Sequence, residues 1–287
     1  MLYSETLIWI KDKLKIAKIP DFDKEANIIL CEVLKTNYLN IYMNRDKRIT
    51  DSQYNKLKSI INQRIKRIPL QYILKKQNFM GYDFKVNSNV LIPRPETEIL
   101  VETVVNLFKE KRDEKIIIAD IGCGCGVIAI LLTKILPNIK KIYAIDISQD
   151  ALNITYENIR LLKIPEEKIE LLQGDKLSPL PQNIKLNCIV SNPPYIPEKE
   201  INSLQPEIVK YEPKLALNGG KDGLDFYRYF SEHSHKYLVN GGYLCLEIGH
   251  NQFSAIKRIF INNKNLKLIN VHLDLNKIKR NVVFERI

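Results

Sequence analysis

The alternation of strand-like and helix-like segments after Glu96 constrains the fold of this chain more than any other feature. Short apolar runs, each the length of one strand, are separated by amphipathic stretches of roughly 10–15 residues. Strands connected by helices of that length pair in parallel, so the pattern predicts a doubly wound α/β sheet. The expected strands are residues 116–121, 141–147, 169–172, 186–191, 242–248, 266–273 and 281–286, and the expected helices are residues 98–109, 127–136, 151–162, 224–238 and 252–261.

The first third of the chain has the period of amphipathic helices instead. Apolar residues recur every three or four positions in residues 3–17, in residues 23–34 and from residue 51 to the residues before Pro69. Thr50 and Asp51 are candidate N-caps for the last of these stretches. We therefore expect a small bundle of helices in this region.

A short connector joins the two regions. Residues 79–86 place alternating apolar residues about Gly81, which predicts a β-hairpin, and residues 87–95 form a loop with two prolines. The predicted organisation is a helical domain over residues 1–70, a hairpin and loop connector over residues 71–95, and an α/β domain over residues 96–287.

The composition excludes several classes of protein. At 287 residues the chain is long enough for about two domains of ordinary size. Its apolar runs are too short to span a bilayer and its first residues lack a signal-peptide core, so we expect a cytoplasmic protein with reduced cysteines and no membrane association. The five cysteines and four histidines do not have the spacing of a zinc site, and no metal is expected.

The net charge of +11 is concentrated in the N-terminal third. Residues 1–95 contain 18 Lys and Arg against 9 Asp and Glu, whereas residues 96–287 contain 26 against 24. A basic domain attracts anionic partners, which include nucleic acids and acidic protein surfaces. A compositional bias toward Lys, Ile and Asn explains the same excess, so charge alone identifies no partner.

A glycine-rich loop follows the first strand of the α/β region, in the sequence Ala119-Asp120-Ile121-Gly122-Cys123-Gly124-Cys125-Gly126-Val127. Glycines let a backbone approach a ligand closely and adopt positive φ angles. The dinucleotide fingerprint GxGxxG needs glycine at the position of Val127, so NAD is disfavoured. Asp146 lies 20 residues after Gly126, at the end of the next strand, where a carboxylate accepts hydrogen bonds from ribose hydroxyls. The two features together predict a nucleoside ligand.

The sequence Ser191-Asn192-Pro193-Pro194-Tyr195 directly follows another apolar strand. The two prolines lack N–H donors, so this loop presents carbonyl oxygens, and the Asn192 side chain adds a further acceptor. Acceptors grouped at the end of a strand suit a planar –NH2 group, and Tyr195 provides an aromatic face for stacking. A turn stiffened by proline is the alternative, but the glycine-rich loop at a neighbouring strand end argues against it.

The glycine-rich loop, Asp146 and the Asn-Pro-Pro-Tyr motif together resemble those of S-adenosylmethionine-dependent N-methyltransferases acting on an amide or exocyclic amine. Nearly the whole chain is similar to the peptide chain release factor glutamine methyltransferase (PrmC/HemK) family. The IPRPETE segment is the most specific part of this resemblance, because DNA and RNA adenine methyltransferases share the Asn-Pro-Pro-Tyr motif. The matching segments are residues 69–74 PLQYIL, 90–98 VLIPRPETE, 191–197 SNPPYIP, 211–217 YEPKLAL, 219–224 GGKDGL, 246–252 LEIGHNQ, and Asp274 with residues 280–283 RNVV.

The resemblance implies a mostly parallel, seven-stranded class I methyltransferase sheet with a small N-terminal helical bundle that engages the protein substrate. The implied reaction transfers a methyl group from S-adenosyl-L-methionine to the amide nitrogen N5 of the glutamine in the GGQ motif of peptide chain release factors, in support of translation termination. The product of the cofactor is S-adenosyl-L-homocysteine. The expected catalytic residues are Asn192, Pro193 and Tyr195. The expected cofactor-binding residues are Asp120, Gly122, Cys123, Gly124, Cys125, Gly126, Asp146, Ile147, Asp175, Lys176 and Asn192, and the expected substrate-binding residues are Arg94, Glu96, Asn192, Pro193, Pro194 and Tyr195.

Two departures from the family pattern concern the cofactor. Cys123 and Cys125 stand where relatives usually have Thr and Ser, which keeps the side chains small but removes a hydroxyl hydrogen bond. Lys176 follows Asp175 where relatives often have an aromatic or apolar residue near the adenine. The sequence therefore does not identify the residues that form the wall of the adenine pocket.

Three other functions fit parts of the pattern. They are adenine-N6 methylation of nucleic acid, methylation of a glutamine in a ribosomal protein, and nucleic-acid binding by a degenerate methyltransferase fold. The intact glycine-rich loop, Asp146 and Asn-Pro-Pro-Tyr motif argue against degeneracy, and IPRPETE argues against the adenine enzymes. We expect a monomer that acts on a protein and has no nucleic-acid substrate.

Overall fold

The computed structural model describes residues 1–111 and 113–287, and the chain forms two compact units. The helical unit consists of Met1–Lys75 together with Gln205–Tyr211, and the sheet unit consists of Lys76–Leu204 together with Glu212–Ile287. The chain therefore leaves the sheet unit after Leu204, adds one short segment to the helical unit and returns at Glu212. No helix within the described residues is long and apolar enough to cross a bilayer.

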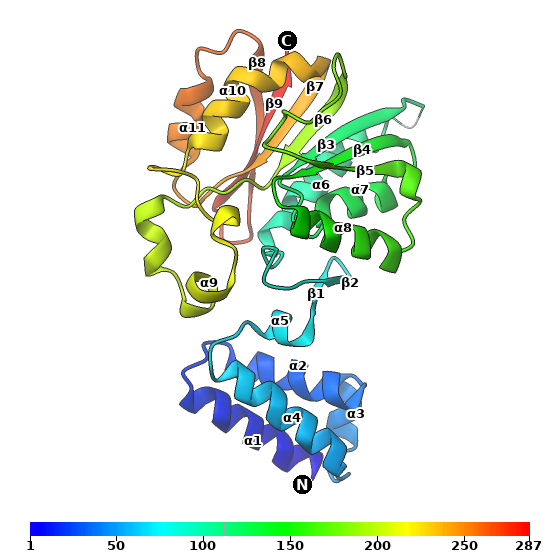
Figure 1. Ribbon diagram of the computed structural model, residues 1–287, viewed down its shortest axis with the longest axis vertical. Helices are drawn as coiled ribbons and strands as arrows, with labels where there is room; N and C mark the ends of the chain where they lie inside the picture. Colours follow the sequence, from blue (N-terminus) through cyan, green and yellow to red (C-terminus); the bar gives the residue numbers. More distant parts are fainter. Residues whose placement is uncertain (112) are drawn as a thin grey trace. The chain divides into compact units, whose positions relative to one another are not determined.

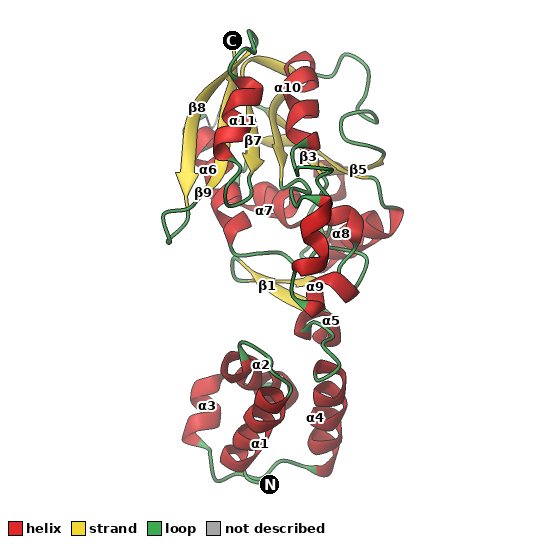
Figure 2. Ribbon diagram, turned by 90° about the vertical axis from the view of Figure 1, so that its left-hand side faces the viewer, coloured by secondary structure: helices red, strands yellow, loops and turns green. Residues whose placement is uncertain are grey.

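The helical unit, whose helices are drawn in Figure 2, is held together by one apolar core. Leu14, Leu30 and Leu57, on three different helices, are fully buried in it. Burying a leucine stabilises a fold by about 1.5–3 kcal/mol, so packing rather than helix propensity holds these short helices. The helices of this unit are α1 (Tyr3–Ile16), α2 (Phe22–Leu34), α3 (Tyr38–Met43), α4 (Asp51–Arg64), α5 (Leu70–Leu74) and α9 (Pro206–Tyr211).

Local sequence signals decide where α4 begins and ends. The Gln53 N–H donates to the Thr50 hydroxyl (3.2 Å) and the Thr50 N–H donates to the Gln53 side chain (2.8 Å), which is a capping box. The helix ends at Arg64, before Pro69 as expected, and the backbone turns left-handed at Arg67 (φ 70°). The sequence pattern also missed α3, α5 and α9, whose six residues or fewer are too short to show a helical period.

Buried ion pairs join α9 to the rest of the helical unit. Arg64 donates to Glu25 from Nε (2.6 Å) and from Nη2 (3.0 Å), and Nη2 also donates to Glu207 (3.0 Å). Arg67 donates to the other carboxylate oxygen of Glu207 (2.7 Å). The side chains of Arg64 and Glu207 are 4% and 9% exposed. Buried charges are tolerated only in such paired geometry, so Glu207 depends on both arginines.

The sheet unit is built on a seven-stranded sheet in the order β5-β4-β3-β6-β7-β9-β8 (Figure 1). The pairs from β5 to β7 are parallel, whereas β9 runs antiparallel to both β7 and β8. The predicted mostly parallel, seven-stranded class I methyltransferase sheet is therefore confirmed. The strands are β3 (Ile116–Ile121), β4 (Ile139–Asp146), β5 (Ile169–Gln173), β6 (Leu186–Ser191), β7 (Leu238–Glu247), β8 (Leu266–Leu273) and β9 (Lys279–Arg286).

Helices cover both faces of this sheet (Figures 1 and 2). One face carries α6 (Glu96–Phe108), α7 (Val127–Ile135) and α8 (Gln149–Leu161), and the other carries α10 (Asp225–Tyr237) and α11 (Phe253–Phe260). The strand order reverses between β3 and β6, and open α/β sheets bind ligands beyond the carboxyl ends of the strands at such a reversal. Short 3-10 helices lie in the connections, at η1 (Glu166–Lys168), η2 (Glu198–Ser203) and η3 (Lys214–Ala216).

A two-stranded hairpin of β1 (Lys76–Phe79) and β2 (Tyr82–Lys85) precedes the sheet. Its turn residues Met80 and Gly81 both have positive φ angles (45° and 80°), as the tight turn of a hairpin requires. Lys85 donates its N–H to Asn158 of α8 (2.7 Å) and accepts from the same side chain (3.0 Å). These two bonds attach the hairpin to the sheet unit.

Candidate active site

The loop between β3 and α7 leaves open space beside its backbone. Gly122 and Gly124 have left-handed φ angles of 72° and 56°, which cost other residues roughly 1–2 kcal/mol. The N–H groups of Gly122 and Cys123 both donate to the Ile145 carbonyl at the end of β4 (2.8 and 3.0 Å). A Cβ on either glycine would meet no heavy atom within 4 Å. The loop is thus fixed against the sheet and admits a ligand on its other side.

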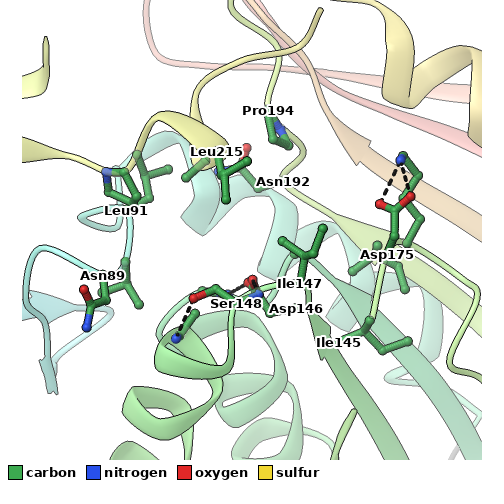
Figure 3. A pocket seen from close by; sticks show the side chains of 18 of the residues that line it. Asn89, Leu91, Ile145, Asp146, Ile147, Ser148, Asp175, Asn192, Pro194 and Leu215 are labelled. Atoms are coloured by element: carbon green, nitrogen blue, oxygen red, sulfur yellow. Dashed lines mark hydrogen bonds and ion pairs between the residues drawn. The ribbon is translucent and has the colours of Figure 1, made fainter. Parts of the chain in front are cut away.

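Asp146 ends β4 and faces this loop (Figure 3). Its Oδ2 accepts from the Gly124 N–H (2.9 Å) and its Oδ1 from the Ser148 N–H (2.9 Å). These bonds fix the plane of the carboxylate, and each oxygen retains a lone pair for a ligand hydroxyl. Burial raises the pKa of Asp146 above its ordinary value, and the backbone N–H bonds limit that rise.

Asp120 and the two cysteines of the loop are buried behind it rather than in the pocket wall. Asp120 accepts from the Ala129 N–H (3.0 Å), and burial raises its pKa to about 7. The Cys123 sulfur lies 3.7 Å from the Thr155 hydroxyl, and burial raises the pKa of Cys125 to about 12. Both thiols therefore stay neutral and fill space. Within the described parts of the chain, no three His, Cys, Asp or Glu side chains are placed to hold a metal ion.

A pocket lies over the carboxyl ends of β3, β4 and β6 (Figure 3). The sequence-predicted residues that line it are Gly122, Gly124, Asp146, Ile147, Asp175, Lys176, Asn192 and Pro194. Sequence reasoning missed two further parts of the wall, which are residues 88–91 before α6 and Pro213, Leu215 and Ala216 after α9. Val90 and Leu91 of the first part and all of the second belong to segments that carried the family resemblance, VLIPRPETE and YEPKLAL, although nothing in their pattern indicated a pocket.

Lys176 is held at the edge of this pocket. Its ammonium group pairs with Asp175 (2.8 Å) and lies over the rings of Phe226 and Tyr229, 4.8 and 5.1 Å from their centres. Cations at these distances are attracted by the ring faces. Phe226 itself lines the pocket. The aromatic face at this edge of the pocket therefore comes from Phe226 of α10.

The Asn-Pro-Pro-Tyr motif places its four residues differently. Asn192 and Pro194 line the pocket, whereas Pro193 is buried. Tyr195 packs against the core of the sheet unit and donates its hydroxyl to Glu247 (3.4 Å). Gln252 donates to the Tyr195 carbonyl (2.8 Å). The Tyr195 ring, which we expected to stack on a ligand, is thus mainly enclosed by protein.

Arg94 and Glu96 of the IPRPETE segment do not line the pocket but form ion pairs beside it. Arg94 pairs with the buried Glu212, the first residue of the sheet unit after α9 (2.5 Å). Burial raises the pKa of Glu212, and Arg94 opposes that rise. Glu96 pairs more loosely with Arg280 of β9 (3.6 Å). The two residues therefore tie the start of α6 to two distant segments.

Two residues that the sequence analysis did not assign complete the surroundings of Asn192. Thr97, in the first turn of α6, accepts a hydrogen bond from the Asn192 Nδ2 (3.0 Å) and donates its hydroxyl to Glu247 (2.7 Å). Glu247 is the last residue of β7 and is 1% exposed. Both residues lie in resemblance segments, but a threonine in a helix and a glutamate at a strand end have no pattern of their own.

The sheet order, the open glycine-rich loop, the acid at the end of β4 and the Asn-Pro-Pro-Tyr loop after β6 define a class I methyltransferase. Residues 5–74 match the family model of the PrmC N-terminal domain, and residues 95–224 match that of the methyltransferase small domain. A methyltransferase from Pyrococcus furiosus has the same fold, with a TM-score of 0.51 and 15% identity over 82% of this chain and 98% of that one.

Similar proteins of known function identify the family within this class of methyltransferases. The release factor glutamine methyltransferase of Thermodesulfovibrio yellowstonii is 40% identical over 263 residues, which cover 92% of each chain. That of Clostridium acetobutylicum is 34% identical over 287 residues, 100% of this chain and 99% of its own. The chain belongs to the release factor glutamine methyltransferase family.

Proposed function

We propose that this protein transfers a methyl group from S-adenosyl-L-methionine to the N5 amide nitrogen of the glutamine in the GGQ motif of peptide chain release factors, and so supports translation termination. The orientation of Asn192 carries the proposal. Its Nδ2 donates to Thr97 (3.0 Å), and among residues 1–111 and 113–287 no donor bonds to its Oδ1. An acceptor is therefore left free at the pocket wall, where an amino group would need one.

The pocket suits the nucleoside part of this cofactor. We assign the ribose hydroxyls to the carboxylate of Asp146, because its two oxygens are fixed and each has a lone pair to offer. The open backbone at Gly122 and Gly124 leaves room beside that carboxylate. Ile147 and Phe226 provide apolar walls for the adenine, and Asp175 and Lys176 border it. When bound, the cofactor supplies an electrophilic methyl group on a sulfonium sulfur.

The acceptor amide requires positioning more than activation. Its nitrogen is a poor nucleophile because the lone pair is delocalised into the carbonyl group. In the proposed arrangement the Asn192 Oδ1 and the Pro193 backbone carbonyl accept the two N–H bonds and fix the –NH2 plane. Such orientation supplies up to about 7–11 kcal/mol in well-aligned reactions. The N–H proton becomes acidic only as positive charge develops, so no strong base is required beforehand.

Recognition of a whole release factor requires more surface than the pocket. We assign this task to residues 1–70, since the basic excess of the chain lies in its first third. We further propose that the enzyme acts as a cytoplasmic monomer on protein and not on nucleic acid. Exposed charges are screened over about 10 Å at 0.1 M ionic strength, so recognition should weaken as salt is raised.

The proposal is tested by incubating the protein with labelled S-adenosyl-L-methionine and purified release factors, followed by mass-spectrometric mapping. Label on the glutamine of the GGQ motif is the expected result. A factor with Gln→Ala in that motif is the matched control and should stay unlabelled. DNA and RNA substrates are tested in parallel. Methylation of adenine, or of another position in the factor, would contradict the assignment.

Asn192→Ala provides the residue-level test. Turnover should fall at least about a hundredfold, as when a fixed polar group is removed from other active sites, while cofactor affinity stays within about twofold. Asn262→Ala, at an exposed position after α11, is the control and should retain full turnover. Parallel losses of turnover and cofactor affinity would show that Asn192 does not act on the acceptor amide.

A further inference from the structure

The hydrogen bonds around Asn192 continue into the interior of the sheet unit. The Asn192 Nδ2 donates to the Thr97 hydroxyl (3.0 Å), and that hydroxyl donates to the Glu247 Oε2 (2.7 Å). The Tyr195 hydroxyl donates to the other oxygen, Oε1 (3.4 Å). Thr97 and Glu247 are 2% and 1% exposed and do not line the pocket. Any effect they have on the substrate must therefore pass through a neighbouring residue, and of Asn192 and Tyr195 only Asn192 lines the pocket.

The direction of these bonds decides which end of the Asn192 amide faces the pocket. A hydroxyl has one hydrogen, and Thr97 gives it to Glu247, so it offers only lone pairs toward Asn192. Only the NH2 group of the Asn192 amide can donate to such a lone pair. The Asn192 carbonyl oxygen is therefore turned away from Thr97. If the hydroxyl reversed, the amide would flip and present N–H groups to an incoming amino group.

We infer that Thr97 and Glu247 are positioning residues that lock the Asn192 amide with its carbonyl oxygen available to the acceptor –NH2 group. This inference rests on the proposed function, because an amino-group substrate is what requires that orientation. This lock, meaning the fixed orientation of the Asn192 amide, needs an ionised Glu247. A carboxylate has no proton, so the Thr97 hydroxyl must donate to it, whereas a carboxylic acid can donate its own O–H to Thr97 and leave the Thr97 hydrogen free to turn toward Asn192.

The surroundings of Glu247 make the lock sensitive to pH. Burial raises the pKa of Glu247 to about 7, the neighbouring Glu96 raises it further, and the hydrogen bond from Thr97, the charge of Arg280 and the hydrogen bond from Tyr195 oppose the rise. The polar and charged groups that face it are Glu96 and Thr97 on α6, Tyr195 after β6, Tyr227 on α10, which donates to its backbone carbonyl (2.9 Å), and Arg280 on β9. Because the pKa is raised, the carboxylate and the complete lock are present above pH 7 and are lost as the pH falls below it.

The first experiment compares Thr97→Val with Thr97→Ser at saturating cofactor. Valine keeps the shape of threonine without the hydroxyl, whereas serine keeps the hydroxyl. Turnover of release factor should fall at least about tenfold in the valine variant and stay within about threefold in the serine variant. Cofactor affinity, measured by calorimetry, should be unchanged in both. Unchanged turnover in the valine variant, or an equal loss of cofactor affinity, overturns the inference.

The second experiment follows turnover against pH for the wild type and Glu247→Gln. Saturating cofactor is required because Asp120, beside the cofactor pocket, also has a pKa of about 7. Wild-type turnover should decline with an acid limb near pH 7. The glutamine variant should be slower and lack this limb, since its amide does not titrate. An acid limb that persists unchanged in the variant removes Glu247 from the lock.

A third measurement needs no substrate. The side-chain amide signal of Asn192, identified by its loss in Asn192→Ala, should exchange slowly with solvent in the wild type and in Thr97→Ser but rapidly in Thr97→Val. Equal exchange in all three proteins overturns the lock. Slow exchange that depends on Thr97, combined with no methylation of any release factor, leaves the lock standing and overturns the proposed function alone.

Discussion

Replacing Arg64 with methionine should destabilise the helical unit by about 3–4 kcal/mol, because it removes the cation shared by the buried Glu207 and the partly buried Glu25. Within residues 1–111 and 113–287, Glu25 forms no ion pair with another cation, and Glu207 keeps only Arg67. Methionine replaces most of the arginine volume, so the loss comes mainly from charge and hydrogen bonding rather than from a cavity.

The magnitude follows from burial and bond count. Arg64 donates three hydrogen bonds to the two carboxylates, and its side chain is 4% exposed. Removing one partner of a buried ion pair costs roughly 3–5 kcal/mol. The lower part of that range applies, because Glu25 is 17% exposed and regains some solvent, and Arg67 still neutralises Glu207.

The single tryptophan of the chain, Trp9, lies in α1 and reports on the helical unit alone. Its fluorescence, followed through urea denaturation, gives the free energy of unfolding of that unit. Lys56→Met, at an exposed position on the same helix as Arg64, is the matched control and should change stability by less than about 0.5 kcal/mol. A loss below about 1 kcal/mol in Arg64→Met would refute the reasoning, since the buried carboxylates would then need no cation.

Two other substitutions test the cofactor end of the site. Asp146→Ala should weaken S-adenosyl-L-methionine binding at least about tenfold, because hydrogen bonds to a charged acceptor are worth roughly 1.5–3 kcal/mol each, and unchanged affinity in calorimetry would remove Asp146 from the site. Gly126→Ala should destabilise the sheet unit by more than about 2 kcal/mol, since a Cβ there lies 2.7 Å from Thr155 in addition to the left-handed φ of 83°. Gly241→Ala, with a similar φ of 73° and open space, should cost only about 1 kcal/mol, and equal thermal shifts in the two variants would show that the contact with Thr155 is unimportant.

The sheet and the cofactor end of the site were predictable because they depend on local patterns. The continuous apolar runs of β3 and β6 are typical of strands buried on both faces, and the intervening helices require parallel pairing. Parallel strands end at one edge of a sheet, so Asp146 and Asn192 had to lie near the glycine-rich loop. Each of these residues stands directly at the end of a recognisable strand.

The remaining contacts join residues that are far apart in the sequence and leave no periodic signal. Thr97 and Glu247 are separated by 150 positions, and Arg64 and Glu207 by 143. A charged residue in an amphipathic helix is most often solvated, so α4 alone did not indicate that Arg64 is buried. The helix α9 was missed for a different reason, because its six residues form too few turns to distinguish it from an irregular loop.

The segment between Asn192 and Leu217 decides whether a substitution in the helical unit alters cofactor affinity at the pocket. Asn192 at its start and Leu215 near its end line the pocket, and its middle forms α9 in the helical unit. Its two ends are joined within the sheet unit, because the Ile196 N–H donates to the Leu217 carbonyl (3.0 Å) and the Gly219 N–H donates to the Ile196 carbonyl (2.9 Å). Loss of the Arg64–Glu207 ion pair should leave these bonds in place, since none of the residues that form them belongs to the helical unit. Arg64→Met should therefore lower the stability of the helical unit while cofactor affinity stays within about twofold, and a larger loss of affinity would mean that the joined ends do not isolate the pocket.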